Sequence, residues 1–542
     1  MLAGAKILID GQPLDPALEG RLIEVRVDDN LMLPDAVSLR IADPGLEHVD
    51  SSPLEIGAEV EVQLAGAEAS ALAKVFKGQI AAVEPEFGAG GAVLAARGYD
   101  YSHALNRTRR TRTFQNMTAA DIARKVVTTA GLTPGTIDSG GGPHDFVQQN
   151  NETDWDFLWR LASRIDFELV VLDKTLHFRR AGGSSGSPLT LRWGENLVSF
   201  RPRVTGVQQV DEVIVRGWDP KTKKAIEATA RADGLDSRIG IARDRVVGAI
   251  GGGTVTVADR PVVTDREADA LAKSVAAQLA NAYVEAKGTC HGDPRLRAGS
   301  KVELAGIGQR FGGSYMVSSS THLYRGAKGY ETRFTISGRT PRSLVDLMTP
   351  APRHEWGGSV VIGVVTQNED PDAMGRVRVK YPALGDDTEG WWARIASPAA
   401  GKDRGLLMMP VVGDEVLLAF EHGDVRRPYV LGSVWNAKEP PGELVKPDGS
   451  FELRSDQKVS VTSKGDVSIT GDKDFKLEAG AKVAQKASGD LSVEGGQTVK
   501  VKAGTSLTIE GGSDVTIKAG GASVSLKPGG VVQVSGSQIM LG

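Results

Sequence analysis

The chain is poor in cysteine, long apolar runs and net charge, and each shortage excludes a class of protein. Cys290 is the only cysteine, so neither a disulfide within the chain nor a cluster of thiolate metal ligands can form. No 18 apolar residues follow one another, and the N-terminus lacks a basic region followed by an apolar stretch, so neither a membrane span nor a signal peptide is predicted. A formal net charge of -4 gives no attraction to phosphate backbones, so nucleic acid is not expected as a partner.

The composition is that of an ordered protein with several domains. Its 542 residues exceed what one hydrophobic core usually organises. Hydrophobic residues make up 40% and charged residues 24% of the chain, which is enough apolar material for folded cores. Glycine is abundant, with 66 residues, and it crowds toward the C-terminus, where a repeat is found.

The C-terminal region repeats with a period of eight residues from Phe451 onward. Each octad has two apolar residues separated by one other residue, which is the alternation of a strand with one buried face. Glycine recurs between most of these strands, where the chain must turn sharply. Only Gln485 interrupts the apolar pairs, and the register moves by one place at Val524 and Leu526, so the end of the repeat is predicted there.

Strands with only two inward-facing residues make a thin prism, which three interleaved chains fill better than one. The octads therefore predict a triple-stranded, intertwined β-helix needle over residues 450–542, built by a homotrimer in which folding and assembly are one event. The alternatives are a low-complexity tail and a monomeric β-solenoid. The predicted needle core consists of Val459, Val461, Val467, Ile469, Phe475, Leu477, Leu491, Val493, Val499, Val501, Leu507, Ile509, Val515 and Ile517.

Residues 355–442 contain five short segments of strand character separated by glycine and aspartate turns, which favours a small barrel with an OB-fold. The runs Gly375–Pro382, Trp391–Arg394, Gly413–Leu417 and Arg427–Gly432 resemble the OB domain of the VgrG and phage baseplate spike family. In that family the OB domain directly precedes a trimeric β-helix of octads, which is the order found here.

The first 350 residues are predicted to form a mainly β hub region with an α+β insert. Thr118 and Thr153 each stand before an apolar helical pattern as N-terminal caps, which predicts two helices in the insert. The stretch from Phe146 to Leu158 is similar to the hub region of phage late-control D proteins and VgrG, which implies two related β-barrel domains per chain. We expect barrel parts at about residues 1–100 and 190–345 and the insert at about residues 100–185.

The resemblance implies a structural role as the central spike and hub of a contractile injection machine, either phage-tail-like or type VI-like, that joins a tail tube to a membrane-piercing needle. The implied partners are tail tube and baseplate proteins, a PAAR-type tip protein and effector cargo, with the target membrane touched only transiently. The tip protein is expected to contact Ile539, Met540 and Leu541. The chain would be made in the cytoplasm and delivered in a particle, outside the cell or into a target cell.

No catalytic, cofactor-binding or metal-binding residues are predicted. Only residues 436–450 separate the barrel from the first octad, so no lysozyme-like domain fits there, and no histidine follows His422 to hold iron at the tip. His422 and Asp424 stand on a predicted hairpin turn, where a structural role is favoured over an acid–base or metal pair. A polysaccharide-degrading β-solenoid enzyme and a surface adhesin are the alternatives, although the octads expose mainly lysine, serine and threonine rather than the converging carboxylates of a glycosidase.

Overall fold

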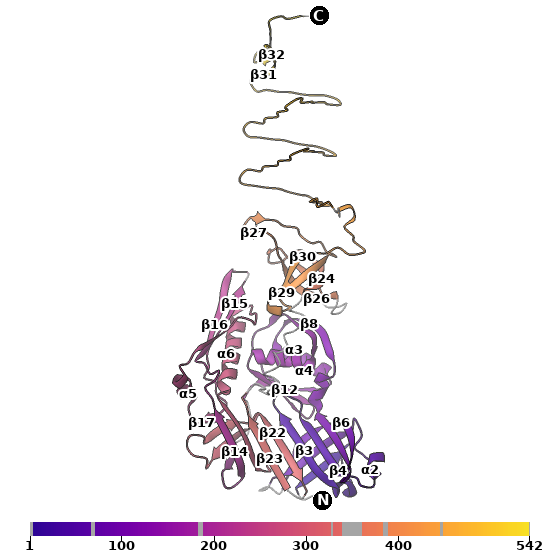
Figure 1. Cartoon of the computed structure of the whole chain (residues 1–542), viewed down its shortest axis with the longest axis vertical. Helices are drawn as coiled ribbons and strands as arrows, with labels where there is room; N and C mark the ends of the chain where they lie inside the picture. The colour runs from indigo at the N-terminus through magenta and orange to yellow at the C-terminus, as the bar shows by residue number, and fades with distance from the viewer. Residues whose placement is uncertain are drawn as a thin grey trace. The chain divides into compact units, whose positions relative to one another are not determined.

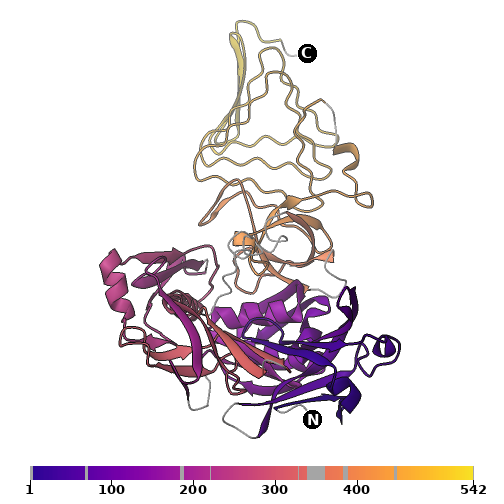
Figure 2. The same cartoon turned by 60° about the horizontal axis from the view of Figure 1, so that its bottom comes forward.

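The computed structural model of the chain consists of two compact units, Met1–Lys446 and Pro447–Gly542 (Figures 1 and 2). Strands dominate, and the α-helices among the described residues all lie in the first unit, so the predicted fold class, mainly β with an α+β insert, is confirmed. The structure describes residues 4–66, 71–182, 188–219, 221–326, 329–338, 360–382, 389–444 and 448–540.

The hub region is built on one eleven-stranded sheet in which strands from both of its ends pair. The separate barrel parts expected at about 1–100 and 190–345 are joined in this sheet, because β3 (Leu22–Asn30) pairs antiparallel with β22 (Ser319–Arg325). On the β22 side the sheet continues with β23 (Gly329–Ile336), β19 (Val284–His291) and β14 (Leu197–Val204). On the β3 side it continues with β4 (Ala36–Ala42), β7 (Gly91–Asp100), β6 (Leu72–Gly88), β5 (Glu59–Ala65), β1 (Ala5–Ile9) and β2 (Gln12–Pro13).

Alternation along each strand decides which face of this sheet is buried. In β5, Val60, Val62 and Leu64 have no exposed surface, whereas Glu59 and Glu61 between them remain partly exposed. The buried face forms one hydrophobic core with two short helices in the connections, α1 (Pro16–Glu19) and α2 (Glu47–Asp50).

The insert contains both predicted helices. Thr118 caps α3 (Ala119–Thr129) and Thr153 caps α4 (Asp154–Arg164), since each hydroxyl accepts a hydrogen bond of 3.1 Å from a backbone amide three residues later. The apolar faces of both helices pack in one core with two small sheets. One sheet pairs β8 (Arg109–Met117) with β10 (His144–Thr153), and the other contains β9 (Thr133–Ile137), β11 (Phe167–Leu172) and β12 (Thr175–Arg180). The short 3-10 helix η1 (Tyr101–Asn106) precedes β8.

The second part of the hub region adds two helices that the sequence reading did not anticipate, α5 (Arg243–Ile250) and α6 (Asp265–Asn281). The small alanine-rich face of α6 packs on β15 and β16 in a separate core. Two further sheets complete this part, β15 (Glu212–Asp219) with β16 (Lys224–Arg231) and β18 (Thr254–Val257), and β13 (Leu189–Arg192) with β20 (Lys301–Ala305), β21 (Gly313–Met316) and β17 (Arg238–Ile239).

A closed five-stranded barrel follows the hub region in the same unit. Its interior is filled by fully buried side chains such as Val377, Val379, Val416 and Leu418. The barrel consists of β24 (Val361–Gln367), β25 (Arg376–Lys380), β26 (Glu389–Ile395), β30 (Pro428–Ser433) and β29 (Glu415–Phe420), and the short pair β27 (Ala400–Gly401) and β28 (Arg404–Gly405) lies in a connection.

In the second unit, the described residues from Asp448 to Asp514 form no strand within the chain. Strands begin at β31 (Val515–Ala519), which continues into β32 (Ala522–Lys527) and β33 (Val531–Ser535) as an antiparallel meander. Ile517 faces Val524 across this sheet. The change of apolar register seen in the sequence thus coincides with the turn between β31 and β32, where the described part of the second unit first forms strand pairs within the chain.

Candidate assembly site

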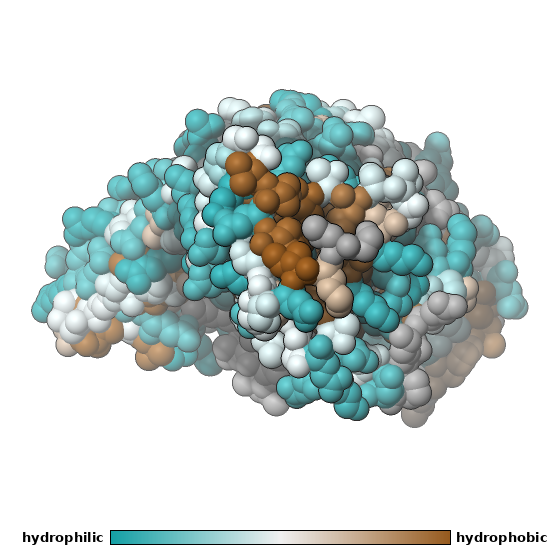
Figure 3. Space-filling model, turned by 90° about the horizontal axis from the view of Figure 1, so that it is seen from above, coloured by the Kyte–Doolittle hydropathy of each residue, from teal (hydrophilic) through white to brown (hydrophobic). Residues whose placement is uncertain are grey.

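The apolar pairs of the octads are exposed in the single chain. Val499 is 54% and Val501 70% exposed, and every predicted needle-core residue except the half-buried Val515 is more than half exposed. Figure 3 shows hydrophobic side chains gathered in one area among polar ones on the face in view. Soluble monomers rarely leave contiguous apolar patches larger than a few hundred Å² open to water, so a ladder of such pairs indicates a surface that is covered in the assembled protein.

The backbone of the octads, like their side chains, indicates a surface that is covered in the assembled protein. Every residue other than proline carries one N–H donor and one C=O acceptor, and strands satisfy these groups through a ladder with a neighbour. The chain supplies no such neighbour to the described residues 448–514. Pairing with other chains would satisfy the backbone and bury the apolar pairs at the same time.

The end of the second unit is also apolar and exposed. Ile539 is 50% and Met540 87% exposed, and both follow the last strand, β33. Leu541, the third residue of the predicted tip contact, lies outside the described residues. The two described residues are therefore accessible to a partner.

The barrel carries an exposed apolar segment, Leu406–Val412, that was not predicted from the sequence. Leu407 is 66%, Met408 63% and Val412 60% exposed. The segment reads Leu-Leu-Met-Met-Pro-Val-Val, so apolar residues do not alternate with polar ones as they do in a half-buried strand. This pattern could have distinguished the segment from the barrel strands.

A nearly buried ionic cluster attaches the barrel to the hub region. Arg426, between β29 and β30, pairs with both carboxylate oxygens of Asp424 at 2.7 Å from Nη2 and 3.1 Å from Nε. Its Nη1 lies 3.5 Å from Oε1 of Glu267 on α6, and the same oxygen lies 3.0 Å from Nδ1 of His144 on β10. These four side chains are only 13–16% exposed. We call them the joint cluster.

The charges of the joint cluster keep its carboxylates ionised. Burial alone would raise both carboxyl pKa values, but the charge and hydrogen bonds of Arg426 outweigh it and hold the pKa of Asp424 well below its usual range. At Glu267 burial would also raise the pKa, but the hydrogen bond with His144 and the charges of Arg426 and Arg164 lower this pKa to about 2. Asp424 is thus engaged structurally, beside His422, which has a left-handed φ of 51° in η4 (Glu421–Gly423).

Apolar and backbone contacts support the same joint. The rings of Phe146 on β10 and Trp391 on β26 stack with centroids 5.3 Å apart. Arg427 donates from Nη2 to the carbonyl of Val262 at 2.7 Å, and Lys221 pairs with Asp372 at 2.8 Å. The joint could not be predicted from local sequence patterns, because the residues that meet across it are more than a hundred positions apart in the chain.

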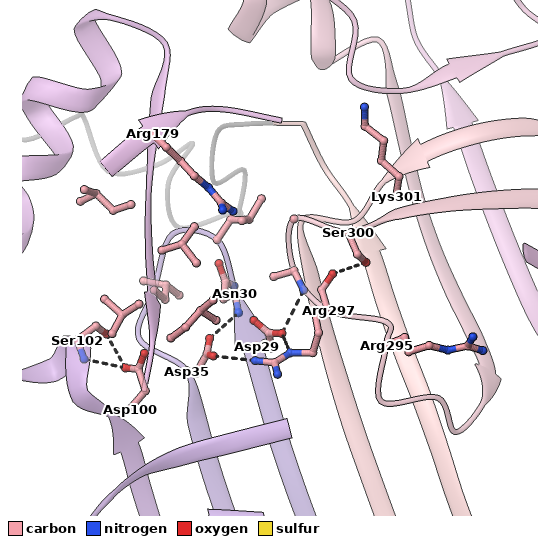
Figure 4. Close-up of a pocket in the computed structure, with 18 of the residues that line it drawn as sticks. Asp29, Asn30, Asp35, Asp100, Ser102, Arg179, Arg295, Arg297, Ser300 and Lys301 are labelled. Carbon is pink, nitrogen blue, oxygen red and sulfur yellow. Dashed lines mark hydrogen bonds and ion pairs between the residues drawn. The ribbon is translucent and has the colours of Figure 1, made fainter. Parts of the chain in front are cut away.

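A second group of ionisable residues joins the two parts of the hub region (Figure 4). Arg297 pairs with Asp29, and its Nη2 lies 3.5 Å from Oδ2 of Asp35, beside a cavity of about 860 Å³. Asp100 lines the same cavity and accepts hydrogen bonds from the amide (3.2 Å) and hydroxyl (2.5 Å) of Ser102. Burial raises the pKa of Asp100 to about 7 despite these hydrogen bonds.

Replacing Asp100 by asparagine is expected to stabilise the protein more at pH 8 than at pH 4. The folded protein holds a proton on Asp100 that the unfolded chain releases near pH 3.9, so the wild type loses stability as the pH rises from about 4 to about 7. The asparagine side chain does not titrate, so the free energy of unfolding should rise by on the order of 1–4 kcal/mol at pH 8. Thermal unfolding at both pH values measures this, with the 92% exposed Asp244→Asn as control. A difference that is the same at both pH values would contradict the assignment.

The described part of the chain offers neither a metal centre nor a membrane-spanning helix. No group of three or more histidine, cysteine, aspartate or glutamate side chains is placed to hold a metal ion there. No helix of that part is both long and apolar enough to span a bilayer.

Two family models match the chain over most of its first unit. The Alg8 N-terminal domain matches residues 2–325, and the type VI secretion system/phage-baseplate injector OB domain matches residues 361–435. The second match contains all five strands of the closed barrel, so the predicted OB-fold is confirmed.

Curated relatives match over shorter segments. The type VI secretion system spike protein VgrG4b of Pseudomonas aeruginosa is 35% identical over 133 residues, which cover 23% of this chain and 16% of that protein. The actin cross-linking toxin VgrG1 of Vibrio cholerae is 26% identical over 168 residues, which cover 28% of this chain and 15% of that protein. The matches thus span about one sixth of the length of these relatives, and they confirm the resemblance to VgrG.

Among solved structures, the Escherichia coli c3393 protein, a component of the type VI secretion system, gives a TM-score of 0.49 at 15% identity. The similarity covers 79% of this chain and 100% of that chain.

Proposed function

Because this chain belongs to the Alg8 N-terminal domain family and carries an injector-type OB domain, we propose that it is the trimeric hub and spike of a contractile injection machine. The partial identity to spike proteins named VgrG supports this role. The observation that carries the proposal is the ladder of apolar octad pairs, which is exposed in one chain and, over the described residues 448–514, has no strand partner in it.

In the proposed assembly, three chains wrap their octads around one axis. Each apolar side chain that becomes buried contributes about 1.5–3 kcal/mol, and the backbone groups of one chain pair with the next. A rod built this way spreads a longitudinal load over hydrogen-bond ladders shared by three chains. It suits a needle that a contracting sheath drives through an envelope.

The proposal assigns one task to each part of the chain. Residues 1–350 form the hub that meets the tail tube and baseplate, residues 355–442 connect hub and needle, and residues 450–542 form the needle. The joint cluster supports the connecting role, because it fixes the barrel to the hub region through buried charges. Effector cargo and transient contact with a target membrane complete the proposed partners.

We propose a mechanical rather than a catalytic role. The positions between the two apolar residues of the octads hold mainly serine, lysine and threonine, which do not supply the paired carboxylates of polysaccharide hydrolysis. Reproducible turnover of peptidoglycan or other polysaccharides by the purified chain would favour the enzyme alternative. Purification of the particle followed by electron microscopy distinguishes a phage-like, a type VI and an extracellular machine.

The full-length chain is expected to sediment as a trimer, with three times the 57.3 kDa mass of one chain. The octads cannot bury their apolar pairs in a single copy, so assembly should persist on dilution. Sedimentation equilibrium measures the mass directly. A well-folded monomer would exclude the intertwined needle and favour the monomeric solenoid or adhesin.

Removing residues 537–542 is expected to abolish binding of a PAAR-type tip protein while the trimer remains intact. This truncation deletes the exposed Ile539 and Met540 and leaves β33 in place. Co-purification with a tagged tip protein measures the loss, and an internal control is the unchanged sedimentation of the truncated chain. Undiminished recovery of the tip protein would place its binding surface elsewhere.

A further inference from the structure

The cavity of about 860 Å³ beside Arg297 lies where three parts of the hub region meet (Figure 4). The end of β3 with the residues after it, the insert, and the turn before β20 all contribute to its wall. Three of the lining residues are acidic and buried: Asp29 and Asp100 are each 6% exposed, and the side chain of Asp35 is 13% exposed. Pockets of roughly 300–1,000 Å³ that contain a few buried polar groups are typical of small-molecule sites. The size of the cavity therefore fits a small ligand.

One guanidinium serves two of these carboxylates. Arg297 pairs with Oδ2 of Asp29, and its Nη2 lies 3.5 Å from Oδ2 of Asp35. The amide of Ala298 donates to the same Oδ2 of Asp29 at 3.1 Å, and none of the described residues donates a hydrogen bond to Oδ1. Asp29 therefore keeps one open acceptor in spite of its burial.

The third carboxylate, Asp100, has no basic partner in the described part of the chain. Its hydrogen bonds come from uncharged donors, namely the amide and hydroxyl of Ser102 and the amide of Asp35. Burial and the charge of Asp29 raise the pKa of Asp100 to about 7, and burial with the charges of Asp29 and Asp100 raises the pKa of Asp35. Because a buried charge is costly unless it is paired, protons take the place of a missing cation.

The other basic side chains that line the cavity do not supply this charge. Arg179 pairs with Glu168 at 2.9 Å, and Arg295 pairs with Asp293 at 2.6 Å. The ammonium group of Lys301 points away from the three carboxylates (Figure 4). An external cation is therefore the group that the acidic end of the cavity lacks.

Much of the remaining wall is apolar. The apolar side chains come from the β3–β4 connection, the insert and β13, and they are Leu31, Leu33, Trp155, Leu169, Val171 and Leu189. An aliphatic chain can lie along such a wall while a charged group at its end reaches a polar site, as the stems of lysine side chains do.

We propose that this cavity binds a primary ammonium group on a short aliphatic chain, such as that of a polyamine or of a lysine side chain. A primary ammonium has three N–H donors and no acceptor, which matches the three carboxylates, and charge-assisted hydrogen bonds of this kind are the strong ones. A metal ion fits less well, because no group of three or more acidic, histidine or cysteine side chains among the described residues is placed to hold one.

The site is tested by titrating n-butylammonium chloride into the full-length protein at pH 8, with total ionic strength held constant by sodium chloride. Isothermal titration calorimetry gives the affinity, and thermal unfolding gives the stabilisation that binding to the folded state produces. Tetramethylammonium chloride, which has the same charge but no N–H donor, is titrated in parallel. We expect butylammonium to raise the melting temperature in a concentration-dependent way and tetramethylammonium to do so much less.

The affinity for butylammonium should fall by about tenfold or more between pH 8 and pH 5.5. Asp100 has a pKa of about 7 without ligand, so at the lower pH it holds a proton that binding must displace. An alkylammonium, with a pKa near that of lysine, about 10.4, keeps its charge at both pH values. Calorimetry at pH 7 in two buffers of different ionisation enthalpy measures the protons released on binding.

Three variants connect the binding to the cavity. Asp100→Asn should weaken butylammonium binding by about tenfold or more and reduce its pH dependence, because a charged hydrogen bond is lost. Asp244→Asn, at the 92% exposed carboxylate, should leave both unchanged. Asp35→Asn should also weaken binding, and it keeps the test meaningful if Asp100→Asn folds poorly.

Two further ligands identify the source of the ammonium group. Tighter binding of spermidine than of butylammonium supports a site for a free polyamine, and equal binding of butylammonium and Nα-acetyl-lysine amide supports a site for a lysine side chain of a partner protein. No response to butylammonium, an equal response to tetramethylammonium, or an unchanged response in both Asp100→Asn and Asp35→Asn would overturn the assignment.

Discussion

Replacing Val499 by aspartate is expected to prevent the full-length chain from forming stable trimers. In the proposed needle this substitution brings three carboxylates close to one axis, where each charge is removed from water without a partner. Burying an unpaired charge costs several kcal/mol, so one trimer would lose on the order of 10 kcal/mol. That loss is comparable with the whole stability of a typical folded domain, about 5–15 kcal/mol.

The neighbouring residue provides a matched control for this substitution. Lys500 follows Val499 in the octad and should point outward, so Lys500→Asp changes charge at the same height without entering the core. Sedimentation and thermal unfolding of both variants separate the two positions. Trimers of normal melting temperature in Val499→Asp would rule out the inward assignment of the octad pairs.

Replacing Arg426 by methionine is expected to destabilise the first unit by about 3–5 kcal/mol at pH 7, because it leaves buried carboxylates without their main counter-charge. Asp424 would lose its bidentate partner, and Glu267 would keep His144, the amide of Val263 and the more distant charge of Arg164. Chemical denaturation at pH 7 measures the loss of unfolding free energy. The matched control is Arg404→Met, at an exposed arginine of the same barrel, which should change stability by less than about 0.5 kcal/mol.

The destabilisation at Arg426 should shrink in acid. The pKa values of Glu267 and Asp424 are lowered in the folded protein, so their pairing with Arg426 contributes stability above the unfolded values near 4.3 and 3.9. This contribution is lost as the pH falls toward about 2, where Glu267 takes up its proton. A variant that is equally destabilised at pH 3 and pH 7 would show that lost packing, rather than lost charge, explains the effect.

Features that depend on residues near one another in sequence could be predicted from the sequence alone. Thr118 and Thr153 indicated α3 and α4 because a capping hydroxyl acts on an amide three residues away. The OB-fold followed from short alternating segments between turns, and the family resemblance rested on runs within these segments and on the stretch from Phe146 to Leu158. The octad ladder was visible because its period is regular over many repeats.

Features that depend on distant residues were missed or only partly anticipated. The joint cluster needs Glu267 and Arg426 to meet, and the shared hub sheet needs β3 to find β22, neither of which leaves a local pattern. Helix α6 is a different case, because Thr264 followed by Glu267 is a capping signal that was present and overlooked. Gly251 ends the unpredicted helix α5 with a left-handed φ of 95°, which glycine adopts without strain.

Because β3 pairs with β22, the hub sheet can be completed only after β22 has been translated. Asp28 on β3 and Thr321 on β22 bond across a separation of 293 residues. At translation rates of about 5–20 residues per second, β22 is synthesised roughly 15–60 s after β3. The octads are synthesised only afterwards, so each nascent chain can complete its hub before the segment that we propose to assemble with two other chains leaves the exit tunnel.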